Sequence, residues 1–411
     1  MSIIDIRDIC HLNSNTKDDT FVGIRCDNGV VNVTFPMGYH ISTDERGIRN
    51  DILRLLNTIV QITGNRDSEL LTDSKLYTQN GFPLQAYMYV ISDYYDRGYY
   101  KEREIQYHAN IRGKIDWNRT IKKQKPYIYN NDAYYLQFIT RKNPLTENEL
   151  ITQIHEYCVY ESFCKIGWLF TRALPQKPRI KFNRKQFLRV VREKYDHTFN
   201  DKNKELFRNL IAIIERVQDS DSPRKFYYGV DPFDHVWEAL IDKVYGIKNK
   251  QDYFPKTEWK LPYGTYGNSD LRPDSIMLWN GNVYVLDAKN YKYGITRNSG
   301  DLPKSTDINK QITYGEFADG YQSKLTNGDK AFNTYNAFLM PFDAHEWNNE
   351  GHLKWIGEAT SSWKNNTNTY ERIQGILVDV KSLMIMANNH DDNAISELAS
   401  CIEHAVIQED H

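Results

Sequence analysis

The sequence has 411 residues, which is more than one average domain and enough for two folded units with ordinary hydrophobic cores. Its 52 basic and 54 acidic side chains leave a net charge of −2 at pH 7, so overall charge does not indicate nucleic-acid binding. No run approaches the ~20 apolar residues that span a bilayer, and the N-terminus lacks the apolar stretch of a signal peptide. We therefore expect a soluble, cytoplasmic protein that does not bind membranes.

Several common site types are missing from the sequence. The five cysteines are an odd number without a CxxC pair, which argues against zinc ribbons, iron–sulfur clusters and a disulfide framework. No Walker A motif occurs, so we do not expect this chain to hydrolyse nucleotides itself. Val159 stands where a zinc HExxH motif beginning at His155 would need its second histidine.

The first segment, residues 1–145, has the pattern of an α+β domain. FVGIRC and GVVNVTF read as strands joined by an Asp-Asn-Gly turn at residues 27–29, a strong hairpin signal. Apolar residues at helical spacing then predict a helix from about residue 43 to a glycine stop at Gly64. We expect this domain to dock a partner or to recognise DNA.

Residues 146–218 read as a helical connector. Thr146 and Glu149 form a capping-box pattern before a long apolar-periodic run. Further helices are predicted near residues 184–195 and 203–217. The polar segment DSDSPRK, residues 219–225, then predicts a domain boundary.

Two clusters in these segments combine basic and aromatic side chains. They lie between Arg112 and Lys125 and between Lys177 and Lys194. Such clusters suit contact with phosphates, and they suit a solvated basic surface equally well.

The last segment, residues 219–411, alternates helices and strands as an α/β sandwich does. The expected order is a helix, a hairpin, a helix, two strands and a terminal helix. These elements are predicted at residues 232–245, 272–289, 307–316, 336–342, 375–380 and 392–406.

The predicted hairpin carries the chemistry. Asn280-Gly281 between two apolar runs favours a two-residue turn, because both turn positions need positive φ. Trp279 then pairs with Asn282, and continuing that register places Asp274 opposite Asp287. Directly opposed residues share one face of a sheet with Cβ atoms ~4.5–5.5 Å apart. Lys289, two residues further on, projects from the same face.

Two carboxylates this close resist joint ionisation unless a cation lies between them. Mg²⁺, a hard cation that prefers oxygen ligands, meets that need, with Asp274, Asp287 and the Ala288 carbonyl as its expected ligands. Such a metal activates water and neutralises charge on a scissile phosphate, while Lys289 orients the water or stabilises the phosphorane. The pattern is that of a PD-(D/E)XK nuclease. The alternative is a surface hairpin in which Asp and Lys form an exposed salt bridge.

Two further residues are weaker candidates. Asp231-Pro232 is predicted to start the helix that carries Glu238, as N-cap and first-turn residue. Glu238 falls beyond the edge of the apolar stripe of that helix, so its position alone fits a solvated glutamate as well as a metal ligand. Gln311 is expected to contact substrate backbone or a catalytic carboxylate, or to be a surface glutamine.

These residues resemble a known family. RPDSIML and VYVLDAKNYKYG, followed by INKQITYGEF, are similar to the nuclease core of McrC and of LlaJI-type restriction endonuclease subunits. Val-Trp-Glu at 236–238 fits the family's apolar, aromatic and acidic helix motif, and residues 111–121 resemble its RG(R/K)I…TI stretch. FVGIRC to VTFPMGY resembles LlaJI-type N-termini, so the landmarks cover most of residues 21–320.

The resemblance implies a PD-(D/E)XK restriction-endonuclease-like C-terminal domain with a mixed central sheet flanked by helices. It implies Asp274 and Asp287 as metal ligands, Lys289 as the catalytic lysine, and accessory roles for Glu238, in the metal shell, and Gln311. It also implies a separate McrB-like AAA+ GTPase that recognises and translocates DNA, with the N-terminal half of this chain docking on it.

We therefore predict a restriction subunit that cuts foreign duplex DNA with Mg²⁺ and leaves 5′-phosphates. Cutting both strands requires two active sites, which fits a homodimer or larger assembly. Two alternatives stay open: a stand-alone, sequence-specific type II restriction enzyme that needs no GTPase, and a non-catalytic adaptor that stimulates a partner NTPase.

Overall fold

The structure is a computed structural model in which two compact units are distinguished, Met1–Gln79 with Pro223–His411, and Asn80–Ser222. It describes residues 5–27, 30–64, 75–78, 83–103, 106–110, 114–130, 132–142, 145–146, 149–171, 173–217, 226–268, 270–326, 332–388 and 392–408. Across these ranges, no helix combines the length and the apolar character needed to cross a membrane.

The first unit contains a five-stranded sheet in the order β1-β3-β2-β12-β4. Its β1 is parallel to β3, and the other pairs are antiparallel. The predicted strands β2 and β3 are confirmed, whereas the turn at Asn28 and Gly29 lies outside the described residues. The strands are β1 (Cys10–Leu12), β2 (Val22–Asp27), β3 (Val30–Phe35), β4 (Lys75–Thr78) and β12 (Phe226–Asp231).

Because β12 lies between β2 and β4, the start of the chain groups with its C-terminal part. The predicted division at residue 145 therefore does not match the compact units, since residues 1–79 separate from 80–145. Paired glycines allow the close approach of β2 and β12. A Cβ at Gly23 would lie 2.3 Å from the Tyr228 carbonyl oxygen, and one at Gly229 would lie 2.3 Å from that of Val22.

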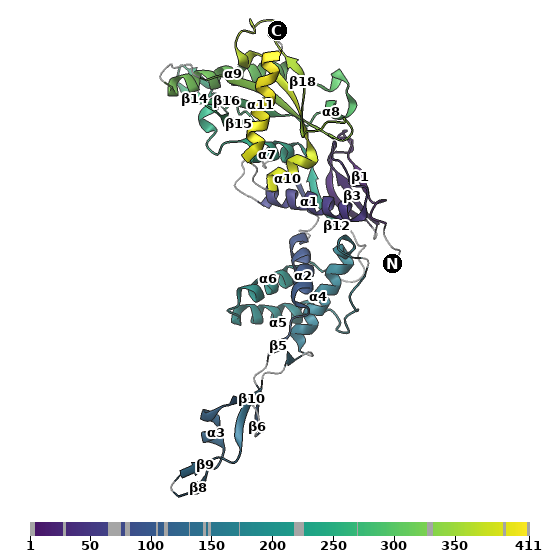
Figure 1. Ribbon diagram of the computed structural model, residues 1–411, viewed down its shortest axis with the longest axis vertical. Helices are drawn as coiled ribbons and strands as arrows, with labels where there is room; N and C mark the ends of the chain where they lie inside the picture. The colour runs from purple at the N-terminus through teal and green to yellow at the C-terminus, as the bar shows by residue number, and fades with distance from the viewer. Residues whose placement is uncertain are drawn as a thin grey trace. The chain divides into compact units, whose positions relative to one another are not determined.

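A second sheet of the first unit follows the order β15-β16-β17-β19-β18 (Figure 1). The pairs β15–β16 and β18–β19 are antiparallel, and β16–β17 and β17–β19 are parallel. This is the mixed sheet that the sequence predicts. The strands are β15 (Ser275–Trp279), β16 (Asn282–Ala288), β17 (Thr334–Phe342), β18 (Leu353–Ala359) and β19 (Ile373–Asp379).

Helices cover both faces of this sheet. On one face, Tyr314 and Ala318 of α9 pack against Val283 and Val285 of β16. On the other face, the hydroxyl of Tyr284 donates to Glu403 of α11 over 2.5 Å, and α7 and α10 pack in the same layer. Their bounds are α7 (Asp234–Tyr245), α9 (Ser305–Leu325), α10 (Val380–Asn388) and α11 (Asp392–Gln408).

The first unit differs from the sequence prediction at one helix start. Asp231 does not cap α7: it is the last residue of β12, where it pairs with Lys75, and Phe233 takes the N-cap position. The strand β18 and the helix α10 were not predicted. The helix predicted from residue 43 to 64 is confirmed as α1 (Glu45–Gly64).

In the second unit, three helices confirm those predicted between residues 146 and 218. They are α4 (Leu150–Ile166), α5 (Arg184–His197) and α6 (Asp201–Arg216), and α2 (Leu84–Arg97) packs with α4 and α6. The predicted capping box is wrong. Thr146 pairs with Glu102 as part of a short ladder between β5 (Glu102–Arg103) and β11 (Leu145–Thr146), and α4 begins only after Glu149, whose side chain makes no cap bond.

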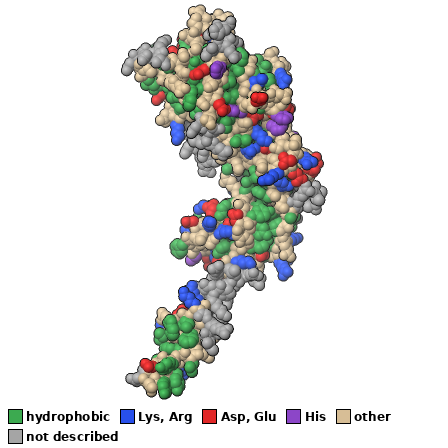
Figure 2. Space-filling model, viewed as in Figure 1, with side chains coloured by type: hydrophobic (Ala, Val, Ile, Leu, Met, Phe, Trp, Pro, Cys, Tyr) green, Lys and Arg blue, Asp and Glu red, His purple; other side chains and the backbone are tan. Residues whose placement is uncertain are grey.

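The rest of the second unit is a small lobe. Exposed hydrophobic side chains gather on it (Figure 2), among them Trp117, Tyr127, Tyr129 and Tyr134. Arg112, at one end of the predicted basic cluster, lies outside the described residues. The elements are β6 (Gln106–Asn110), β7 (Lys114–Ile115), α3 (Trp117–Lys123), β8 (Tyr127–Tyr129), β9 (Asp132–Tyr134) and β10 (Phe138–Lys142).

A buried carboxylate joins α1 to α10 within the first unit. Asp51 is 1% exposed and receives hydrogen bonds from Tyr39, Arg54 and the Ser42 amide, while Lys381 forms an ion pair with it at 2.9 Å. Burial alone would raise the pKa of Asp51, but the bonds from Ser42 and Lys381 outweigh burial and lower it.

We predict that Asp51→Asn lowers the free energy of unfolding by about 1.5–3 kcal/mol at pH 7, the range for hydrogen bonds to charged groups. Because the folded pKa of Asp51 is lowered, its contribution is present above its unfolded pKa of ~3.9 and is lost as pH falls further. Urea unfolding between pH 3 and 7 measures this. Equal stability of the two proteins at pH 7 would contradict the assignment.

Candidate active site

The β15–β16 hairpin has the predicted register. Asn280 and Gly281 form its turn with φ of 48° and 84°. The ladder pairs Trp279 with Asn282 and ends with Ser275 opposite Leu286. The next step of the same register relates Asp274 to Asp287. A one-residue shift would have turned either side chain to the other face.

Contacts bring the predicted site residues together. The backbone N–H of Ala288 donates to Oδ2 of Asp274 over 2.8 Å, which ties Asp274 to the strand that carries Asp287. Asp287 is 4% exposed, and its Oδ2 lies 2.7 Å from Nζ of Lys289. The alternative of an exposed salt bridge is therefore excluded, since the Lys289 side chain is itself 17% exposed.

Negative charge accumulates around Asp274. Burial raises the pKa of this carboxyl well above its usual range, and the neighbouring Asp287 and Glu238 raise it further, against the Ala288 N–H and Lys289. Burial would lower the pKa of Lys289, but Asp287, Asp274 and Asp307 together raise it. The ammonium is therefore held charged, yet its charge does not outweigh burial and the neighbouring carboxyl groups at Asp274.

Asp307 is a site residue that the sequence analysis missed. Its Oδ1 lies 3.6 Å from Nζ of Lys289, and the hydroxyl of Tyr291 donates to its Oδ2 over 3.3 Å. Asp307 stands at the start of α9, four residues before Gln311, so helical spacing from Gln311 was the available signal.

Glu238 lies near the site on α7. Its Oε2 is 3.2 Å from Nδ1 of His235, another residue that sequence reasoning missed. Burial raises the pKa of Glu238, the interaction with His235 lowers it, and Asp234 and Asp287 raise it. Glu238 is thus within electrostatic range of the paired aspartates, whereas its role as a metal ligand stays a prediction.

Gln311 is not a surface residue. It is 1% exposed, and its amide nitrogen donates to the Val285 carbonyl over 2.8 Å and to Oδ1 of Asn336 over 3.3 Å. These contacts fasten α9 to β16 and β17. In this arrangement the amide nitrogen is bonded to the sheet rather than to a catalytic carboxylate, and contact with substrate stays a prediction.

The donor set suits a hard divalent cation. Within the described ranges, no three or more His, Cys, Asp and Glu side chains already form a group that would hold a metal ion. Mg²⁺ needs no such cage, because it binds through one or two carboxylates and completes its shell with water and substrate phosphate. Asp274 and Asp287 supply two such carboxyl groups, and burial together with the nearby Asp287 and Glu238 raises the pKa of Asp274, as expected of a site that lacks positive charge.

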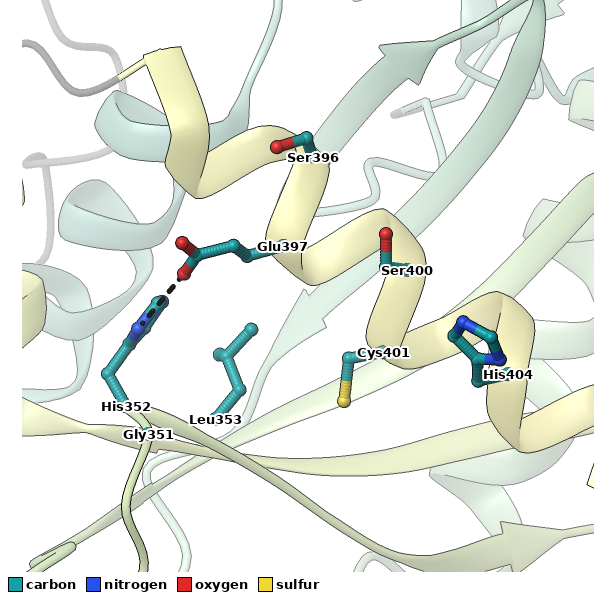
Figure 3. Close-up of a pocket in the computed structure, with 8 residues that line it drawn as sticks. All are labelled: Gly351, His352, Leu353, Ser396, Glu397, Ser400, Cys401 and His404. Atoms are coloured by element: carbon teal, nitrogen blue, oxygen red, sulfur yellow. Dashed lines mark ion pairs between the residues drawn. The ribbon is translucent and has the colours of Figure 1, made fainter.

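A separate cavity of about 400 Å³ lies between β18 and α11 (Figure 3). It is lined by residues such as Cys401 and His404, and Nδ1 of His352 lies 3.3 Å from Glu397. None of the predicted site residues lines it. Because β18 and β15 are opposite edges of the sheet, this cavity is distinct from the Asp274–Asp287 site.

The chain is similar to restriction proteins. It shares 26% identity over 261 residues with the type II restriction enzyme BsuMI component YdjA of Bacillus subtilis (strain 168), a match that covers 59% of this chain. The chain thus spans only 55% of the length of that relative.

Two solved assemblies from Thermococcus gammatolerans also match, each with 14% identity. One is a half-complex of McrB AAA+ hexamers with bound McrC, with a TM-score of 0.37 over 94% of this chain and 82% of the other. The second is the McrBC complex, with a TM-score of 0.23 over 54% and 64%. At these scores we infer nothing from either likeness about the fold or partners of this chain.

The family model described as LlaJI restriction endonuclease matches residues 21–354, which include the β15–β16 hairpin and all of the predicted site residues. The predicted family is thereby confirmed: this chain belongs to the LlaJI restriction endonuclease family.

Proposed function

We propose that this chain is the DNA-cleaving subunit of a restriction system and hydrolyses phosphodiester bonds of duplex DNA with Mg²⁺. The observation that carries the proposal is the hairpin register that relates Asp274 to Asp287, with Lys289 bonded to Asp287, in a member of this family. The mixed sheet with helices on both faces agrees with a PD-(D/E)XK nuclease domain.

In this proposal, Asp274, Asp287 and the Ala288 carbonyl hold the ion, with Glu238 in its outer shell. Bound there, Mg²⁺ supplies a more acidic water and positive charge beside the scissile phosphate. Burial raises the pKa of Asp274 and the nearby Asp287 raises it further, and a cation shared by the two carboxyl groups would offset that repulsion.

Lys289 has the chemistry of a transition-state stabiliser. Its ammonium lies between Asp287 and Asp307, and those carboxylates keep it protonated and fix its direction. A fixed positive charge stabilises the negative charge that develops on the phosphorane oxygens. Water attacks phosphorus, the bond to the 3′ oxygen breaks, and the products carry a 3′-hydroxyl and a 5′-phosphate.

The chain is further proposed to act as one component of a larger enzyme. Its relative YdjA is called a component of a type II restriction enzyme, which supports a division of labour among several chains. A McrB-like AAA+ GTPase is the partner that the family resemblance predicts. The stand-alone type II enzyme and the non-catalytic adaptor are the competing readings.

Removing the central charges tests the site. We predict that Asp287→Asn abolishes plasmid cleavage and that Lys289→Ala lowers kcat on the order of 10²–10³-fold, the loss typical of one preorganised stabilising group. Glu258→Gln and Lys260→Ala, on the exposed β13 strand (Glu258–Leu261), are matched controls that should cut normally. Full activity of Asp287→Asn would refute the proposal.

Metal binding can be tested without measuring cleavage. A folded pKa above the unfolded value means that ionising Asp274 costs stability, so metal-free stability falls as pH rises above ~3.9. Mg²⁺ at ten times its Kd should restore about 1.4 kcal/mol, measured by urea unfolding at pH 7.

Asp274→Asn keeps an acceptor for the Ala288 N–H but removes the charge. We expect this variant to be more stable than the wild type without Mg²⁺ and to gain little when Mg²⁺ is added, while Glu258→Gln responds as the wild type does. An Asp274→Asn protein with the full Mg²⁺ response would show that the ion binds elsewhere.

Partner dependence separates the remaining readings. We predict that the purified chain with Mg²⁺ alone leaves plasmid largely uncut and that adding its AAA+ partner with GTP produces linear DNA. Efficient, site-specific cutting by the chain alone would favour the stand-alone type II enzyme. GTPase stimulation without any cleavage would favour the adaptor.

A further inference from the structure

Helix α9 holds a second lysine beside the site, Lys310. One turn before it, Asp307 lies 3.6 Å from Nζ of Lys289. One turn after it, the hydroxyl of Tyr314 donates to the carbonyl of Arg272 over 3.2 Å. Arg272 lies two residues before Asp274 in the sequence. Side chains at this spacing share one face of a helix, so Lys310 lies between contacts to the ends of both strands of the hairpin.

The side chain of Lys310 is directed by an aromatic ring. Its Nζ lies 5.4 Å from the ring centroid of Tyr314, within the range of a cation–π interaction. Tyr314 is 1% exposed, whereas Lys310 is an exposed residue. A lysine whose stem follows a buried ring while its ammonium meets solvent is oriented without being neutralised.

The charge of Lys310 interacts electrostatically with residues of the site. Burial would lower its pKa, but Tyr314 and Asp287 raise it and Lys289 opposes them, with a net rise. Lys289 has carboxylates on two sides, Asp287 and Asp307. Among the residues that the structure describes, Lys310 forms no ion pair with a carboxylate. Its positive charge is therefore available to an anionic substrate.

We propose that Lys310 binds a nonbridging oxygen of the phosphate next to the scissile phosphate and so positions the DNA strand. This inference rests on the proposed function and names a further substrate contact of the same site. Lys289 is largely buried against Asp287 and meets the reacting phosphate, whereas the exposed Lys310, further out on α9, meets the backbone beside it.

The test compares two lysines of the same helix. Lys324, in the last turn of α9, is exposed like Lys310 and lies about four turns from it along the helix. Lys310→Ala and Lys324→Ala therefore remove the same charge from the full chain at different distances from the site. Lys310→Arg keeps the charge. Binding to a fluorescent DNA duplex in EDTA is measured by anisotropy at several salt concentrations.

Loss of one phosphate contact should weaken binding by Lys310→Ala about tenfold and reduce its salt slope by about 0.9, with Lys310→Arg close to the wild type. Lys324→Ala should leave the slope unchanged. In cleavage assays, Lys310→Ala should raise KM about tenfold and change kcat less than about threefold. A similar small effect of both alanine variants would overturn the inference and leave the proposed function intact.

The nuclease assignment can also fail while DNA binding by Lys310 is retained. If the wild type binds duplex DNA and only Lys310→Ala loses salt slope, but no condition yields cleavage, Lys310 is a DNA phosphate contact and the nuclease assignment fails. A wild type that shows no salt-dependent binding to the duplex would overturn the Lys310 contact directly.

Discussion

The register of the β15–β16 hairpin is the constraint on which the rest of the site depends. Two positive φ values at Asn280 and Gly281 fix the turn, and packing keeps the register. Val283 and Val285 point to the face covered by α9, so the alternating direction of side chains brings Asp287 to that same face. A slip by one residue would turn the valines away from α9 and separate the carboxylates, which the packing of α9 opposes.

Packing of this kind brings like charges together at a cost. Burial raises the pKa of Asp274, and the neighbouring carboxyl groups of Asp287 and Glu238 raise it further toward the neutral form. The ammonium of Lys289 partly offsets this rise in the pKa of Asp274. Functional sites often keep such electrostatic frustration, because the missing positive charge is supplied by the ion or substrate that the site binds. In the function proposed here, Mg²⁺ would supply that charge.

Local features of the site could be predicted from the sequence, and distant ones could not. The Asn-Gly turn and alternating apolar residues determine the hairpin within a short stretch of chain. The sequence therefore predicts that Asp274, Asp287 and Lys289 share one face of it. Asp307 and His235 lie on helices, and only the tertiary packing of those helices brings the two side chains to the site. Gln311 was a candidate from its place on the helix after the hairpin, but its burial against Val285 and Asn336 depends on where α9 lies on the sheet.

The same limit explains the misplaced domain boundary. The strand pattern near the N-terminus was recognised, yet its pairing with β12, about 200 residues later, carries no local signal. Asp231 and Thr146 each looked like helix caps by composition, and each is used as the end of a strand instead. Side chains that favour caps also tolerate strand ends, so only the long-range pairing decides between the two.

The most direct test of the proposed metal site is a crystal structure of the chain grown with Mn²⁺, in which anomalous scattering locates the ion. We expect an ion bound by carboxylate oxygens of both Asp274 and Asp287, at the ~2.0–2.2 Å typical of small divalent cations on oxygen. An ion bound elsewhere, with Asp274 and Asp287 left without it, would contradict the central claim that this hairpin forms the metal site.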